Sequence, residues 1–227
     1  MIGVFDSGAG GLTAISEIRR LAPMADVCFF ADRKNAPYGT KGRNELIRLV
    51  KADIERLRLF GAERILMACC TASTVHRYLP AETRAIAEPI ILPTARKAAR
   101  VTADGRIGVI ATEATVASGA FSKALSRFAN VKEIFELPLQ ALVSLVERGA
   151  RDNRVTKKEK NELRKMLLPI KESGVDTLIL GCTHFPHLEA EIGDCLPGVK
   201  LVSSSREGAI EVLKTTSPHG TGKTYYI

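Results

Sequence analysis

The chain has 227 residues, of which 45% are hydrophobic and 26% charged, and it carries a formal net charge of +8. No apolar run approaches the roughly 18 residues of a membrane-spanning helix, so no membrane segment is predicted. The basic residues are spread along the chain and only 5% of residues are aromatic, which argues against nucleic-acid binding as the main role. Five cysteines without disulfide-framework spacing, and an N-terminus without a secretory signal, indicate a reducing cytoplasm.

The apolar runs and amphipathic segments alternate along the chain. In chain order, strands are predicted at residues 2–5, 26–31, 65–67, 89–92, 107–110, 131–135, 178–180, 199–202 and 225–227. Helices are predicted at residues 12–21, 43–60, a segment ending near 78, 93–101, 116–128, 138–148, 157–172, 186–195 and 206–213. This alternation is typical of an α/β protein with mainly parallel sheets. Residues 107–110 echo residues 2–5, so we expect two related α/β halves.

A glycine-rich turn follows the first strand. Its glycines, at positions 8, 10 and 11, do not have the G-x-G-x-x-G spacing of a dinucleotide site. Asp6 opens the turn, where it either caps the next helix or faces a ligand at the end of the strand. In a later loop, Pro37, Tyr38 and Gly39 form a second turn, which is either a plain surface turn or one that presents a phenol or backbone N–H groups to a pocket.

One stretch of the chain occurs twice. Residues 61–69 and 174–182 both read Gly, apolar or Ala, acid, polar, three apolar, small and Cys. The short apolar runs suit strands buried on both faces of a parallel sheet, so Cys69 and Cys182 each lie at a carboxyl edge, where ligands bind in open α/β sheets. A helix that begins just beyond such an edge points its dipole at the sulfur, which predicts a lowered thiol pKa.

Two thiols at matching edges predict proton transfer on two faces of one substrate. One thiolate removes a proton from a stereocentre while the opposing thiol delivers another to the other face. Asp6 near Cys69, and His184 two residues after Cys182, are the side chains able to move protons to and from the thiols. The pattern therefore predicts inversion of a stereocentre that bears an acidic hydrogen.

Cysteines can also bind zinc, form a redox dithiol or have a purely structural role. A zinc site built from Cys69, Cys182 and His184 is disfavoured, because the chain has no C-x-x-C pair. A redox dithiol is disfavoured because strand ends that hold a substrate between them are too far apart for a disulfide. Cys28, in mid-strand, and Cys195, at a helix end, are expected to be structural.

Four segments together resemble the cofactor-independent glutamate racemases of the aspartate/glutamate racemase superfamily. These segments are residues 3–12, 37–39, 68–72 and 180–186. The resemblance implies two pseudo-symmetric α/β domains with the active site in the cleft between them. It also implies conversion of L-glutamate to D-glutamate without a cofactor or metal, in the cytoplasm, for peptidoglycan supply. A homodimer is one assembly compatible with the resemblance.

The resemblance also implies roles for individual residues. Cys69 and Cys182 match the two acid/base residues, with Asp6 assisting the first, His184 assisting the second and Glu147 holding the histidine. The positions that match substrate-binding residues are Ser7, Pro37, Tyr38, Gly39, Cys70, Thr71 and Thr183. The implied domains are residues 1–92 with 203–227, which carry Asp6 and Cys69, and residues 93–202, which carry Cys182 and His184.

The chain departs from the family pattern at two positions. Cys70 stands where the family has Asn, which removes an amide able to donate and accept hydrogen bonds, and Ser203 stands where the family often has Asp. Loss of one buried polar contact costs about 1–3 kcal/mol. Racemisation of another acidic amino acid, or a weakly active relative kept for ligand or protein binding, are therefore alternatives to glutamate racemisation.

Overall fold

The computed structural model describes residues 1–152, 156–216 and 220–227, except for the side chains of residues 147–152. Within this part the strands form two parallel sheets, one five-stranded and one four-stranded. The first has the order β4-β3-β1-β2-β9, with β1 (Ile2–Asp6), β2 (Val27–Ala31), β3 (Arg64–Met67), β4 (Ala87–Pro89) and β9 (Thr224–Tyr226). The second has the order β6-β5-β7-β8, with β5 (Arg106–Ala111), β6 (Glu133–Pro138), β7 (Thr177–Gly181) and β8 (Lys200–Ser203). The predicted α/β class is confirmed.

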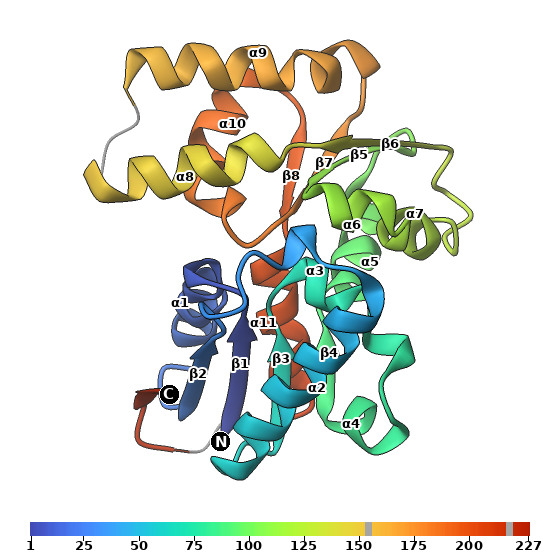
Figure 1. Ribbon diagram of the computed structural model, residues 1–227. Coiled ribbons are helices and arrows are strands. Elements are labelled where there is room, and N and C mark those ends of the chain that lie inside the picture. Colours follow the sequence, from blue (N-terminus) through green and yellow to red (C-terminus); the bar gives the residue numbers. More distant parts are fainter. Residues whose placement is uncertain (153–155, 217–219) are drawn as a thin grey trace.

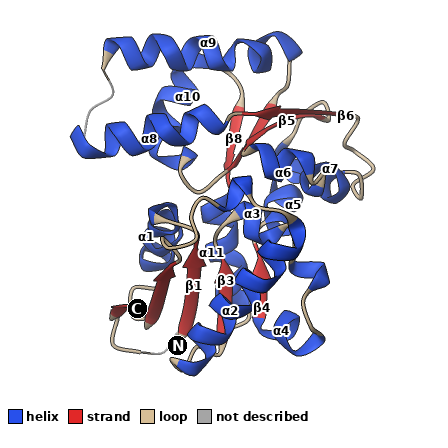
Figure 2. Ribbon diagram, viewed as in Figure 1, coloured by secondary structure: helices blue, strands red, loops and turns tan. Residues whose placement is uncertain are grey.

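Helices flank both sheets (Figures 1 and 2). They are α1 (Leu12–Leu21), α2 (Arg43–Leu59), α3 (Cys70–Ser73), α4 (Ala81–Ile86), α5 (Ile91–Val101), α6 (Glu113–Ala117), α7 (Ala120–Leu125), α8 (Gln140–Asp152), α9 (Lys157–Ser173), α10 (Glu189–Cys195) and α11 (Ser204–Lys214). Because both faces of each sheet are covered, the central strands are mainly apolar, and every residue of β1 and β7 is buried. No helix in the described ranges is long and apolar enough to cross a membrane.

The carboxyl edges of the two sheets point toward each other (Figure 1). In the first sheet the register pairs Phe5 with Met67, so the residues after β1 and β3 emerge side by side. In the second, Ala111 pairs with Gly181, so the residues after β5 and β7 do the same. An apolar cluster that includes Ile90 and residues of both β5 and β7 links the halves, and α11 packs against α1, α5 and β3.

Several predicted elements need correction. The helix predicted at 186–195 is a 3-10 turn over Phe185–Leu188 followed by α10. The strand predicted at 89–92 ends at Pro89, because Ile90 and Ile91 are buried in the apolar cluster that links the halves and begin α5 instead. The helix predicted at 116–128 is two helices, separated at Gly119, which has φ +60°. The helix predicted to end near 78 is the single turn α3 followed by a 3-10 turn over His76–Tyr78.

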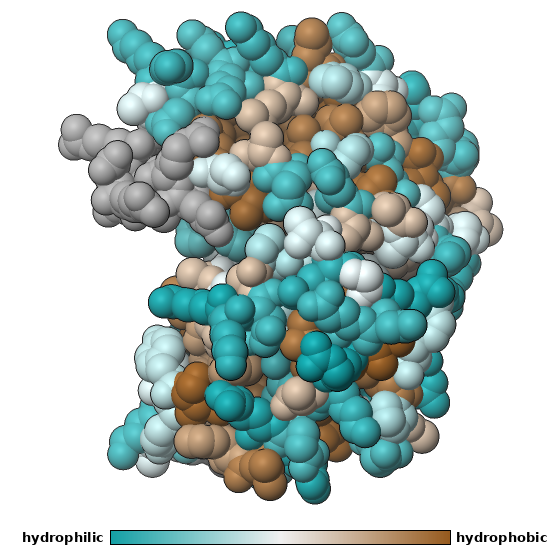
Figure 3. Space-filling view, in the orientation of Figure 1, coloured by the Kyte–Doolittle hydropathy of each residue, from teal (hydrophilic) through white to brown (hydrophobic). Residues whose placement is uncertain are grey.

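The face seen in the space-filling view is largely hydrophilic over both halves (Figure 3). This agrees with the high charged fraction of the sequence.

Candidate active site

A cavity of about 70 Å³ lies between the two sheet edges. The first half contributes Asp6, Ser7, Gly8, Ala36, Pro37, Tyr38, Gly39, Cys69, Cys70 and Thr71, and the second half contributes Thr112, Gln140, Val143, Gly181, Cys182, Thr183 and His184. The structure therefore brings together every predicted site residue except Glu147. Glu147 falls within α8, and its side chain lies outside the described residues.

The first thiol lies where β3 ends and the single-turn helix α3 begins. Cys69 is the residue before α3, and its Sγ lies 3.7 Å from Ser7 Oγ. Burial, together with the nearby charge of Asp6, raises the pKa of Cys69 to about 12. A backbone N–H of Ala72 partly opposes this rise.

The second thiol has a histidine as its neighbour. Cys182 follows β7 directly, and its Sγ lies 3.6 Å from His184 Nδ1. Burial raises the pKa of Cys182 well above its ordinary value, and a hydrogen bond from the His184 backbone N–H opposes the rise. The charges of Cys70, Cys69 and Asp6 add smaller upward contributions.

The predicted lowering of the thiol pKa values is wrong for this state of the protein. Helix α3 has only four residues, and the segment after Cys182 begins as a 3-10 turn over Phe185–Leu188. Such short helices have small dipoles, whereas burial penalises a thiolate strongly. The pKa values of both Cys69 and Cys182 are raised, so both side chains are neutral thiols at neutral pH. Each therefore needs a neighbouring base to become a thiolate.

Asp6 connects the two halves across the cavity. Its carboxylate accepts hydrogen bonds from Thr183 Oγ1 at 2.7 Å and from Ser7 Oγ at 3.2 Å. Burial raises the pKa of Asp6, while the Thr183 hydrogen bond and the charge of His184 lower it. Neither the turn at Ala9–Gly11 nor α1 has a side-chain cap, so Asp6 serves the cavity and does not cap a helix. Its oxygens thereby reach the residue beside the second thiol.

Gly10 is required by the close approach of the two halves. A Cβ added to Gly10 would overlap Thr183 Oγ1 and would lie 2.9 Å from His184 Nδ1. Any side chain at this position would therefore push Thr183 and His184 away from the first half. The glycine-rich turn predicted from the sequence provides close backbone approach.

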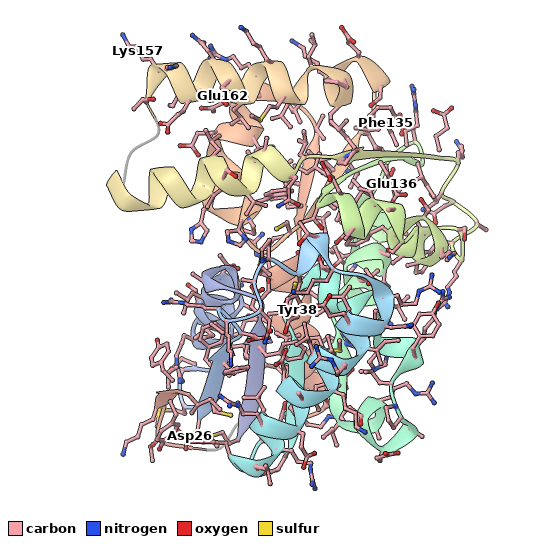
Figure 4. The ribbon with its side chains drawn as sticks, viewed as in Figure 1. Asp26, Tyr38, Phe135, Glu136, Lys157 and Glu162 are labelled. Carbon is pink, nitrogen blue, oxygen red and sulfur yellow. The ribbon has the colours of Figure 1, made fainter. Side chains whose placement is uncertain are left out.

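The hydroxyl of Tyr38 is already bonded within the protein. Tyr38 lies near the boundary of the two halves (Figure 4), and its Oη is 2.6 Å from both Asp32 Oδ2 and Asp53 Oδ2. The phenol is thus not available to a substrate. The polar groups that this turn can still offer to a substrate are the backbone groups of residues 37–39. The Ala36–Pro37 peptide bond is cis.

One hydroxyl proton cannot bond to two carboxylates at once. One of the two acids must therefore carry a proton and donate it to the phenol oxygen. Asp53 is the better candidate, because burial, partly opposed by the Tyr38 hydrogen bond and reinforced by the charge of Asp32, raises its pKa to about 7.

The protonation of Asp53 predicts a pH-dependent stability. Because its folded-state pKa of about 7 is above the unfolded value of 3.8, folding takes up a proton between these values. The contribution to the free energy of unfolding is present below about pH 4 and is lost as pH rises through 7, by roughly 2–4 kcal/mol. Asp53→Asn mimics the protonated acid, so its urea-unfolding profile between pH 4 and 8 is expected to be flatter than that of the wild type. Parallel profiles would contradict a protonated Asp53.

Cys70 lines the cavity but directs its thiol elsewhere. Its Sγ donates to Ser204 Oγ at 3.5 Å, and the side chain packs in the same apolar cluster as Ile90 and Ile91. Ser204 in turn donates to the Leu180 carbonyl at 2.8 Å. The position where the resemblance implies a substrate-binding amide thus holds a small, mainly apolar side chain.

The sequence interpretation missed Thr112, Thr115 and Gln140. Thr71 Oγ1 lies 3.0 Å from Thr112 Oγ1 and 3.1 Å from Thr115 Oγ1, which makes a hydroxyl cluster across the two halves. Thr112 follows β5 in the place that Ser7 takes after β1, so the internal repeat contained a signal for it. No signal marks Gln140, because only the packing of α8 brings it to the cavity.

The two other cysteines lie outside this cavity. Cys28 is buried in β2, and Cys195 ends α10 and is partly exposed. Ser203 caps α11 by accepting a hydrogen bond from the Arg206 backbone N–H.

Comparison with known proteins gives consistent results. A family model described as Asp/Glu/Hydantoin racemase matches residues 19–211. A glutamate racemase from Desulforudis audaxviator is 41% identical over 203 residues, which are 88% of this chain and 73% of that protein. The crystal structure of glutamate racemase isoform RacE1 from Bacillus anthracis has a TM-score of 0.88 and 33% identity, with coverage of 100% of this chain and 86% of that one. A glutamate racemase from Francisella tularensis, in complex with D-glutamate, has a TM-score of 0.82 and 27% identity, with coverage of 99% and 86%.

Proposed function

Because the chain belongs to the Asp/Glu/hydantoin racemase family and is an amino-acid racemase, we propose that its substrate is glutamate and that two thiols interconvert the enantiomers. The substrate assignment rests on relatives named glutamate racemase over most of this chain. The mechanism rests on one observation: Cys69 follows a strand of the first sheet, Cys182 follows a strand of the second, and both line one cavity.

The proposed reaction transfers one proton out and one proton in. A thiolate on one side takes the Cα proton and becomes a thiol, while the bonding electron pair is delocalised into the α-carboxylate. The thiol on the other side then donates its proton to the opposite face of Cα and becomes a thiolate. Since both thiols have raised pKa values, Asp6 and His184 are proposed to accept the proton that activates Cys69 and Cys182, respectively.

The remaining polar groups are proposed to hold the substrate. The hydroxyls of Ser7, Thr71, Thr112 and Thr183 and the backbone of residues 37–39 supply neutral donors for two carboxylates, and Cys70 lines the cavity beside them. Glu147 is proposed to hold His184, as the family resemblance implies. No Lys or Arg lines the cavity among the described residues, so the carboxylates are bound by hydrogen bonds.

The wider role is proposed from the same relatives. We place the enzyme in the cytoplasm, working without a cofactor, with D-glutamate going to peptidoglycan. A homodimer is the proposed assembly, and the proposed domains are residues 1–92 with 203–227 and residues 93–202.

The test is exchange of the Cα hydrogen. Purified protein is incubated in D₂O with L- or D-glutamate, and separately with aspartate, without added cofactor. Circular dichroism is expected to show loss of optical activity for glutamate, together with deuterium at Cα. Racemisation of aspartate alone would assign the other acidic substrate, and binding without exchange of any acidic amino acid would refute the enzymatic proposal.

A further inference from the structure

Gln140 places an unsatisfied polar atom at the active-site cavity. Its Oε1 is buried and has no hydrogen-bond partner among the described residues, although the residue lines the same cavity as both thiols. A buried acceptor without a partner costs about 1–3 kcal/mol, so such atoms in folded proteins call for a ligand or a functional reason. Here the cavity is where a ligand would supply the missing donor.

Gln140 lies beside Gly39 and Thr112 in the lining of the cavity. A Cβ added to Gly39 would lie 3.1 Å from Gln140 Oε1 and 3.6 Å from Thr112 Cβ, so these three residues adjoin one another. Gly39 comes from the loop before α2, and Gln140 is the first residue of α8. The carboxamide therefore sits where the first and second halves meet over the cavity.

The chemistry of an acidic amino acid identifies the donor. At neutral pH its two carboxylates accept hydrogen bonds and do not donate them, whereas its ammonium group has three N–H donors. The cavity has hydroxyls at Ser7, Thr71 and Thr112 that can donate to the carboxylates, and its side-chain acceptors include the Asp6 carboxylate and Gln140 Oε1. Asp6 already accepts hydrogen bonds from Thr183 and Ser7, whereas Gln140 Oε1 has no partner in the described residues.

We propose that Gln140 is a specificity-determining residue whose side-chain oxygen accepts a hydrogen bond from the substrate's α-ammonium group. This inference rests on the proposed acidic amino-acid substrate and adds a residue to its site. Among the polar groups of an acidic amino acid at neutral pH, only the ammonium can donate to this unpaired oxygen. Gln140 thereby distinguishes an amino acid from a plain dicarboxylate, and helps to orient Cα between the thiols.

The test compares glutamate with glutarate, which has the same two carboxylates and no amine. Gln140→Met keeps the length of the side chain and removes the amide oxygen. We expect the KM for both glutamate enantiomers to rise about ten- to hundredfold, as for a lost hydrogen bond to a charged group. The inhibition constant of glutarate is expected to change less than about twofold, because glutarate never used the contact. The ligand-free variant should melt at the same temperature or higher, since an unpaired buried acceptor is gone.

Gln140→Glu provides a second variant that keeps a side-chain oxygen acceptor. It is expected to bind glutamate more tightly, relative to glutarate, than Gln140→Met does. Glu136 serves as the matched control, because its Oε1 is also buried without a partner while the residue lies on β6 and does not line the cavity. In Figure 4 it is labelled in the second half. Glu136→Gln should leave the constants for glutamate and glutarate unchanged.

Two outcomes would overturn the assignment. Equal weakening of glutamate and glutarate by Gln140→Met would mean that the amide contacts a carboxylate. No weakening of either would mean that Gln140 does not contact the substrate. If the wild type does not racemise glutamate, the proposed substrate fails without any variant. The Gln140 comparison can then still be made by calorimetry, with the acidic amino acid that does exchange and its deaminated diacid.

Discussion

Cys69→Ser and Cys182→Ser are each expected to lower kcat/KM for racemisation by about 10³-fold or more, in line with the loss of a positioned acid/base group. A neutral serine hydroxyl is a far weaker base than a thiolate, so it takes up the Cα proton poorly. Polarimetry with each enantiomer measures the loss.

The two variants are expected to differ in which enantiomer they still deprotonate. Each keeps one thiol with its own partner, Ser7 and Asp6 beside Cys69 or His184 beside Cys182. Each variant should therefore exchange the Cα hydrogen of one enantiomer faster than that of the other, with opposite preferences. Cys195→Ser is the control, because Cys195 lies outside the cavity. Undiminished racemisation by either active-site variant would contradict the two-thiol mechanism.

Gly10→Ala is expected to lower kcat/KM by about 100-fold, because a displacement of about 1 Å in a catalytic group costs that much. The added methyl would overlap Thr183 Oγ1 and crowd His184 Nδ1. It would also disturb the 2.7 Å hydrogen bond between Thr183 and Asp6. Initial rates with D- and L-glutamate, followed by circular dichroism, measure the effect.

Gly10→Ala is expected to affect the two enantiomers unequally. Because His184 neighbours Cys182 and not Cys69, exchange of the enantiomer deprotonated by Cys182 should fall more than exchange of the other. Gly42→Ala is the control, since a Cβ added at Gly42 meets no atom within 4 Å. If Gly10→Ala and Gly42→Ala retained equal activity, the close contact between the glycine-rich turn and the second half would not matter for catalysis.

Much of the fold could be predicted because its cues are local. The apolar runs of β3 and β7, each followed within two residues by a cysteine, were predicted as buried parallel strands, and the structure agrees. The glycine-rich turn after β1 could also be predicted from the sequence, since close backbone approach requires glycine. Element boundaries were predicted wrongly where tertiary packing overrides local preference. Ile90 and Ile91 were predicted as strand residues, but burial between the two halves places them at the start of a helix.

The sequence by itself determined that Asp6, Cys69 and Cys182 lie at the carboxyl ends of parallel strands, because each stands at the end of a short apolar run. Only the tertiary structure decided how these groups behave. The raised thiol pKa values follow from burial, which depends on the packing of both halves. The hydrogen bonding of the Tyr38 hydroxyl to two carboxylates, and the burial of the unpaired Gln140 oxygen in a residue that lines the cavity, depend on contacts between segments distant in the chain. The periodicity and spacing of a sequence do not reveal such contacts, because they relate each residue only to others near it in the chain.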